Sequence, residues 1–211
     1  MYVLLLMSIL ATAIIFLKLY QFYRSGLRKI EFIDTTVSEL TQGDYRQVVE
    51  DLQKQPNPVA RVLESAVSFG AVPAMSREDV EAEVSRVGSA QIRNLESWLR
   101  GLSSIAHLSP LLGLLGTVTG MIAAFMNLQE AGSRVDPSIL SGGIWEALLT
   151  TAFGLAVAIP AMAAFYYLEG EVDYVRAAMK DASIQVLRHF GKTPHVSSRD
   201  DERIEDETHG L

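Results

Sequence analysis

The chain has 211 residues, no cysteine and a formal charge of −7, with 49% hydrophobic and 20% charged residues. This composition is too apolar for an ordinary soluble domain and indicates a membrane protein. The absence of cysteine excludes disulfides, thiolate metal sites and cysteine nucleophiles, and the acidic balance gives no sign of a nucleic-acid surface.

Three stretches are long and apolar enough to span a bilayer, which takes about 20 residues. They are residues 1–19, 102–129 and 137–168, and the third contains one charged residue, Glu146. No basic region precedes the first stretch, so we interpret it as a retained anchor rather than a cleaved signal. The sequence therefore predicts an all-α integral membrane protein with three transmembrane helices.

Basic residues indicate how these helices are oriented. They follow the first span, precede the second and follow the third, whereas the 130–136 connection carries only Arg134. By the positive-inside rule the N-terminus is outside and the C-terminus inside. Residues 20–101 then form a cytoplasmic region, and 130–136 form a short periplasmic loop.

The cytoplasmic segments have the spacing of helices. Residues 20–75 predict two or three short helices, with breaks at Gly43 and at residues 56–58. Ser76 and Asp79 resemble a capping box, and apolar residues then recur every three or four positions through Trp98. We therefore expect one unbroken helix from this cap into the second span.

The third span is also expected to continue outward. A helical extension over residues 169–195 should end at Gly191 and Pro194. Residues 196–211 read as a disordered acidic tail, because they combine a high charge with few apolar residues.

Small residues mark one face of the second span. Gly113, Gly116 and Gly120 allow another helix to approach closely, either within this chain or in a larger assembly. Thr117 lies on the same stripe. Its hydroxyl either bonds its own helix or faces a pore and meets water or an ion.

Glu146 is the notable residue of the third span. Asp136 and Pro137 suit a helix start, which places the carboxylate about 14 Å along the helix, near the middle of the bilayer. An unpaired charge there costs several kcal/mol, so the side chain should face a bundle interior or a water-filled cavity. A neutral glutamic acid hydrogen-bonded to a neighbouring helix is the alternative.

Beside Glu146 the third span carries a small and hydroxylated face. Its members are Ala147, Thr150, Thr151, Gly154 and Ala158. Pro160 here and Pro110 in the second span each remove a backbone donor and predict helix kinks.

Enzymatic chemistry has no support in the sequence. The four histidines have no metal-ligand spacing, and there is neither a phosphate-binding glycine loop nor a nucleophile elbow. We expect neither a metal site nor an enzyme.

Two segments resemble the signature stretches of the ExbB/TolQ/MotA proton-channel family. One is Pro110-Leu-Leu-Gly-Leu-Leu-Gly-Thr-Val-Thr-Gly120, and the other runs from Glu146 through Thr150-Thr151-Ala-Phe-Gly154 to Pro160. Both occur in the family order with a short loop between them, and together they cover residues 105–168. Three spans rather than four favour the ExbB/TolQ branch over MotA.

The resemblance implies a homopentameric ring in the bacterial inner membrane. Its pore would hold two copies of a single-span partner of the ExbD or TolR kind, whose aspartate carries the ion. A periplasm-spanning protein of the TonB or TolA kind is a further possible partner, and membrane lipid surrounds the ring. Residues matching Thr117 and Thr151 line the pore in this family, and the one matching Glu146 is the polar membrane residue of the third span.

Our hypothesis is an ion pathway along Thr117, Glu146, Thr150 and Thr151, with the small residues packing helices in the ring. The translocated ion is H⁺, with Na⁺ also compatible with the hydroxyls, and no cofactor is implied. Ion passage would turn ring against partner and energise transport or envelope processes. A non-conducting scaffold is the alternative, and an autonomous transporter is disfavoured because three spans are too few for inverted repeats.

Overall fold

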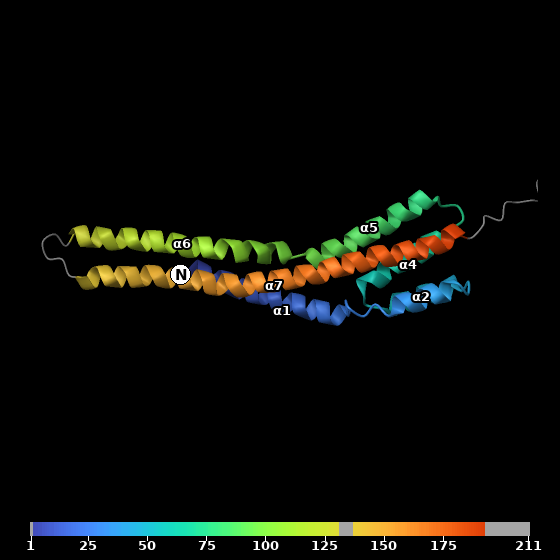
Figure 1. The fold of residues 1–211 in the computed structure, drawn as a ribbon, viewed down its shortest axis with the longest axis horizontal. Coiled ribbons are helices and arrows are strands. Elements are labelled where there is room, and N and C mark those ends of the chain that lie inside the picture. Colours follow the sequence, from blue (N-terminus) through green and yellow to red (C-terminus); the bar gives the residue numbers. More distant parts are fainter. Residues whose placement is uncertain (1, 131–136, 193–211) are drawn as a thin grey trace, which may run out of the picture. The chain divides into compact units, whose positions relative to one another are not determined.

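Every regular element that the structure describes is a helix. The computed structural model describes residues 2–130 and 137–192. The helices, shown in Figure 1, are α1 (Tyr2–Ser25), α2 (Phe32–Leu40), α3 (Tyr45–Lys54), α4 (Pro58–Gly70), α5 (Arg77–Glu96), α6 (Leu99–Glu130) and α7 (Pro137–Lys192). The predicted all-α fold is confirmed.

Three helical stretches are long and apolar enough to cross a membrane. They are Tyr2–Ser25, Arg77–Glu130 and Leu140–Gly191. Many of their large apolar side chains point outward from the chain, including Leu6, Leu114 and Leu148, which are 57–65% exposed. Such a surface suits lipid or further subunits. The three predicted spans are therefore present by length and composition.

The chain divides into two compact units. The first contains the described parts of Met1–Leu27 and Gln91–Val175, and thus α1, α6 and most of α7. The second contains Arg28–Ala90 and the described residues from Arg176 onward.

In the second unit, α2, α3 and α4 occupy the region where the sequence predicted short helices. Gly43 lies between α2 and α3 and has φ +84°. This left-handed backbone ends a right-handed helix and favours glycine. Asn57 caps α4: its Oδ1 accepts a 2.9 Å bond from Val59 N, and its Nδ2 donates to Lys29 O. Both predicted breaks are confirmed.

The end of α7 packs against α3 and α4 within this second unit. The rings of Phe190 and Tyr45 lie 5.5 Å apart, and a Cβ atom at Gly70 would lie 2.5 Å from the Phe190 ring. Glycine at the end of α4 therefore makes room for the aromatic side chain.

The cap of α5 confirms one prediction, and its end overturns another. Ser76 Oγ accepts a 3.1 Å bond from Asp79 N, as the capping pattern predicted. The helix does not run unbroken into the second span, because it stops at Glu96 and α6 begins at Leu99. Trp98, expected on the buried stripe, has φ +66° and a side chain 63% exposed. This left-handed residue cannot continue a right-handed helix.

The two longest membrane stretches contain the predicted prolines. Pro110 lies inside α6 and Pro160 inside α7, and both helices are assigned continuously through them. The predicted kinks at these residues stay predictions. The helix start at Asp136, the 131–136 connection and the acidic tail lie outside the described residues.

Candidate functional site

Glycines bring α6 and α7 into close contact. A Cβ atom at Gly113 would lie 3.2 Å from Thr151 Cα and 3.3 Å from Gly154 Cα. One at Gly154 would lie 2.7 Å from the carbonyl oxygen of Ser109. Because the neighbours are backbone atoms, only glycine allows this separation.

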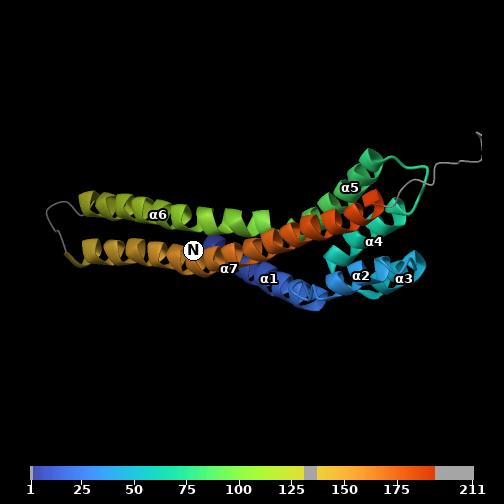
Figure 2. The same cartoon turned by 45° about the vertical axis from the view of Figure 1, so that its right-hand side comes forward.

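Further contacts continue towards the end of α6. A Cβ atom at Gly116 would lie 2.8 Å from Thr150 Cβ, and one at Gly120 would lie 3.0 Å from Ala147 Cβ. Residues later in α6 thus contact residues earlier in α7, so the two helices are antiparallel. Figure 2 shows them side by side.

The predicted packing residues therefore make a contact within the chain. Gly113, Gly116, Gly120, Ala147 and Gly154 all lie in it, and Ala158 is 3% exposed on the same face of α7. Their role in packing between subunits of a ring stays a prediction.

Thr151 reaches across this contact. Its Oγ1 donates a 2.9 Å hydrogen bond to the carbonyl oxygen of Gly113, and its side chain is half-buried. Thr150 is turned differently: its Oγ1 bonds the carbonyl oxygens of Ala147 and Glu146 in its own helix, at 2.7 and 3.0 Å. The hydroxyl of Thr151 thus bonds the neighbouring helix, whereas that of Thr150 bonds its own helix.

Thr117 lies on the same flank of the helix pair as Thr151. Thr117 follows Gly113 on α6 by four positions, and Thr151 follows Ala147 on α7 by four positions. Four positions turn a side chain by about 40° around its helix, in the same sense for both helices. In antiparallel helices, equal rotation carries both side chains to one side of the pair. We call this side the threonine flank. Thr117 is half-buried and donates a 2.7 Å bond to Leu114 O.

Glu146 points away from the threonine flank. Five residues separate it from Thr151, or about 140° around the helix. Its side chain is exposed, and among residues 2–130 and 137–192 no hydrogen bond or ion pair of its carboxylate is found. The chain alone does not satisfy this carboxylate, so neither predicted environment for it is tested.

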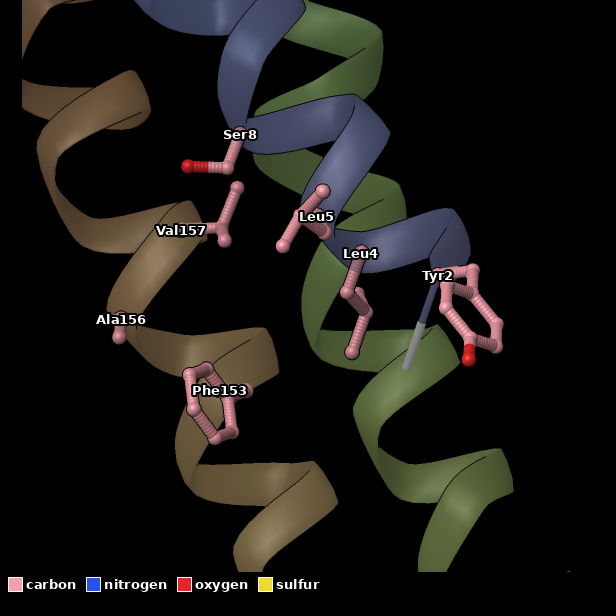
Figure 3. A pocket seen from close by; sticks show the side chains of 7 residues that line it. All are labelled: Tyr2, Leu4, Leu5, Ser8, Phe153, Ala156 and Val157. Carbon is pink, nitrogen blue, oxygen red and sulfur yellow. The ribbon is translucent and has the colours of Figure 1, made fainter.

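Helix α1 covers the other flank. With α7 it encloses a pocket of about 380 Å³, lined by Tyr2, Leu4, Leu5, Ser8, Phe153, Ala156 and Val157 (Figure 3). We call this side the α1 flank. Glu146 is seven residues before Phe153, so it lies on nearly the same face of α7, about 10 Å nearer the helix start.

From the sequence, no role was assigned to two fully buried polar residues of the first unit. Ser109 is fully buried, and its Oγ donates a 2.7 Å bond to Ile105 O at the tightest point of the α6–α7 contact. Lys18, which lies within residues 1–19, is also fully buried. Spacing shows neither role, because both depend on partners in the fold.

Comparison with known proteins identifies the family. Residues 54–181 match the model of the MotA/TolQ/ExbB proton channel family. The chain belongs to this family. The match includes the α6–α7 contact with both threonines and Glu146, and it leaves out the first span.

Relatives within the ExbB and TolQ branches support the assignment. An ExbB homolog of Methanothermobacter thermautotrophicus is 33% identical over 70% of this chain and 53% of its own length. An ExbB-like protein of Synechocystis is 30% identical over 72% of this chain and 71% of its own. TolQ of Haemophilus influenzae is 38% identical over 50% of this chain and 48% of its own.

The family resemblance inferred from the sequence is thereby confirmed. Membership of this family makes the chain a multi-pass membrane protein. The MotA/TolQ/ExbB family consists of channel and transport proteins, which agrees with the expectation that the chain is not an enzyme. The chain spans about half the length of the Methanothermobacter homolog and of TolQ.

Proposed function

We propose that the protein is the ring-forming subunit of a proton-channel motor in the bacterial inner membrane. Family membership supports proton conduction, and the threonine flank of the α6–α7 pair supports a place for it. The N-terminus lies outside and residues 20–101 and 169–195 lie in the cytoplasm, as the basic residues indicate.

The threonine flank is the proposed pore wall. The α1 flank is occupied by the chain's own first helix, so it faces the periphery of a ring. The opposite flank, with Thr117 and Thr151, then faces the centre. Five copies would enclose a pore with two rings of hydroxyl oxygens.

The hydrogen bonds of these threonines determine what they can bind. Both hydroxyl protons are donated to backbone carbonyls, at 2.7 Å for Thr117 and 2.9 Å for Thr151. The oxygens therefore remain acceptors, because a hydroxyl has one proton and two lone pairs. An acceptor suits a protonated carboxyl, water or a hydrated cation.

A partner must supply the group that carries the ion. Glu146 points about 140° away from Thr151, so the threonine flank of this chain has no carboxylate of its own. We propose two copies of an ExbD/TolR-like single-span protein in the pore, with an aspartate that protonates beside Thr117 and Thr151. A TonB/TolA-like protein would carry the output across the periplasm.

The proposed output is mechanical. One proton moving down the membrane potential releases about 2.3 kcal/mol per 100 mV, so useful work needs many repeated steps. Protonation and deprotonation of the partner aspartate would rotate the partner relative to the ring. This rotation would energise transport or envelope processes.

Proton flux in liposomes tests the proposal. The ring, reconstituted with its single-span partner, is energised by a potassium diffusion potential, and internal pH is recorded. Thr151→Val removes the acceptor oxygen and should lower the flux at least tenfold, whereas Thr151→Ser should retain most of it.

Thr119→Val is the matched control. Thr119 is in the same helix as Thr117 and also bonds its own backbone, but it lies about 200° around α6 from Thr117. Equal losses in the Thr119 and Thr151 valine variants, or normal flux in Thr151→Val, would contradict a pore along the threonine flank.

A further inference from the structure

The ammonium group of Lys18 is fully buried near the end of α1. Its Nζ donates to Gln21 Oε1 at 2.9 Å, to Leu95 O at 3.0 Å and to Ser97 Oγ at 3.1 Å. These three short bonds match the three N–H groups of an ammonium, and Asn94 O lies farther away, at 3.5 Å. The Phe22 ring, with its centroid 5.9 Å away, adds a cation–π contact.

Two of these acceptors belong to the break between α5 and α6. Leu95 O is among the last carbonyls of α5, which have no partner inside their own helix. Ser97 lies in the break and donates its hydroxyl proton to Asn94 O at 2.7 Å. A positive charge is also favourable at the negative end of a helix dipole. Lys18 is therefore a cap supplied from 77 residues away in the sequence.

The break itself carries backbone strain. Trp98 has φ +66°, a conformation that large L-residues rarely adopt. Its side chain is 63% exposed, so packing of the indole does not hold it there. Strain of this kind persists only where surrounding contacts compensate for it. The carbonyl of Trp98 accepts the bond from Leu102 N that begins α6.

We propose that Lys18 is a positioning residue that holds the α5–α6 break open against the tendency of residues 91–110 to form one helix. In an unbroken helix, the Leu95 carbonyl would accept from the N–H of Leu99. The buried ammonium would then share this acceptor with the backbone, which weakens its bond in a place where no water can replace it. Lys18 thus fastens the first span to the point where the second membrane helix begins, whatever the protein conducts.

The sequence agrees that a continuous helix is the competing state. Val84, Val87, Gln91, Leu95, Trp98 and Leu102 keep the three- and four-residue spacing across the break. Neither glycine nor proline lies at residues 97 and 98 to end the helix. The break therefore depends on a contact from outside the segment.

Spin-label distances in the full chain test the proposal. The protein has no cysteine, so Arg93→Cys and Leu108→Cys give one label pair at exposed positions on either side of the break. In an unbroken helix, 15 residues span about 22 Å. We expect the mean distance in the parent protein to differ from this value and to shift to about 22 Å when Lys18→Met is added.

A second substitution separates this role from general damage. Glycine adopts positive φ freely, so Trp98→Gly added to Lys18→Met should restore the parent distance distribution. Arg24→Gln, which removes an exposed charge from the same helix, should leave it unchanged.

An unchanged distribution in Lys18→Met would overturn the proposal, as would failure of Trp98→Gly to restore it. If Lys18→Met does not accumulate in the membrane, Ser97→Ala removes one acceptor and keeps the ammonium. That variant should broaden the distribution towards 22 Å, and a distribution identical to the parent's would again overturn the proposal.

Discussion

The hydroxyl of Thr151 on α7 donates a 2.9 Å hydrogen bond to the backbone carbonyl of Gly113 on α6. This bond crosses the helix pair where Gly113 and Gly154 bring the backbones closest. One side chain thus joins the two signature segments of the family and presents its oxygen to the proposed pore. Loss of conduction at this residue must therefore be separated from loss of packing.

Stability measurements provide that separation. Thr151→Val should lower the free energy of unfolding by about 0.6 kcal/mol, the mean for an interhelical hydrogen bond in a membrane, and at most about 1.7. Thr151→Ser should be near neutral. Titration with SDS in mixed micelles measures both. A loss of several kcal/mol in Thr151→Val would mean that its flux defect reports unfolding.

Gly154→Ala should destabilise the contact between α6 and α7. The new Cβ would lie 2.7 Å from Ser109 O and 3.0 Å from Gly113 Cα, both backbone atoms that cannot move independently. Overpacking of this kind costs about 1–3 kcal/mol. The same SDS titration measures it.

Gly142→Ala is the control for that substitution. It lies in the same helix with nothing within 4 Å of its Cβ position. It should be neutral or raise stability by up to about 1 kcal/mol, since alanine is the better helix former. Equal effects of the two variants would mean that α6 and α7 do not approach at Gly154.

Glu146→Gln tests whether ionisation at this position is used. Glutamine keeps hydrogen bonding and removes the titratable proton, so flux in the liposome assay should fall at least tenfold if the carboxylate participates in conduction. Glu146→Asp should retain part of it. Full flux in the glutamine variant, with the ring intact, would favour a packing or scaffold role for this residue.

Native mass spectrometry should show the proposed ring. Five copies of the 23.2 kDa chain give about 116 kDa, and the complex should gain two copies of the single-span protein. A monomer that does not bind the single-span protein would contradict both the proposed ring and the proposed pore.

Asn57→Ala should destabilise the second unit by about 1–2 kcal/mol, because it removes the cap of α4. The side chain is 2% exposed, and its amide also holds Lys29 O at 3.1 Å. Asp44→Ala removes the exposed cap of α3, with its longer 3.3 Å bond, and should cost less. Hydrogen exchange of the α3 and α4 amides compares them, and equal protection losses would contradict the difference in burial.

The sequence by itself determined the features that depend on local pattern. Hydropathy located the three membrane helices, and the small residues at Gly113, Gly120 and Gly154 marked the faces that meet. Gly43 and Asn57 marked the ends of the short helices. These predictions succeeded because helix length, amphipathicity and turn chemistry are encoded by neighbouring residues.

The tertiary structure alone decided how these faces are used. Periodicity continued through Trp98, and only the contact of distant Lys18 with Leu95 explains why the helix breaks there. Helical spacing already places Glu146 about 140° from Thr151, but only the contacts with α6 and α1 show which flank of the helix pair each residue faces. A buried ammonium and a shared helix face each depend on partners far away in the chain, and no local pattern specifies those partners.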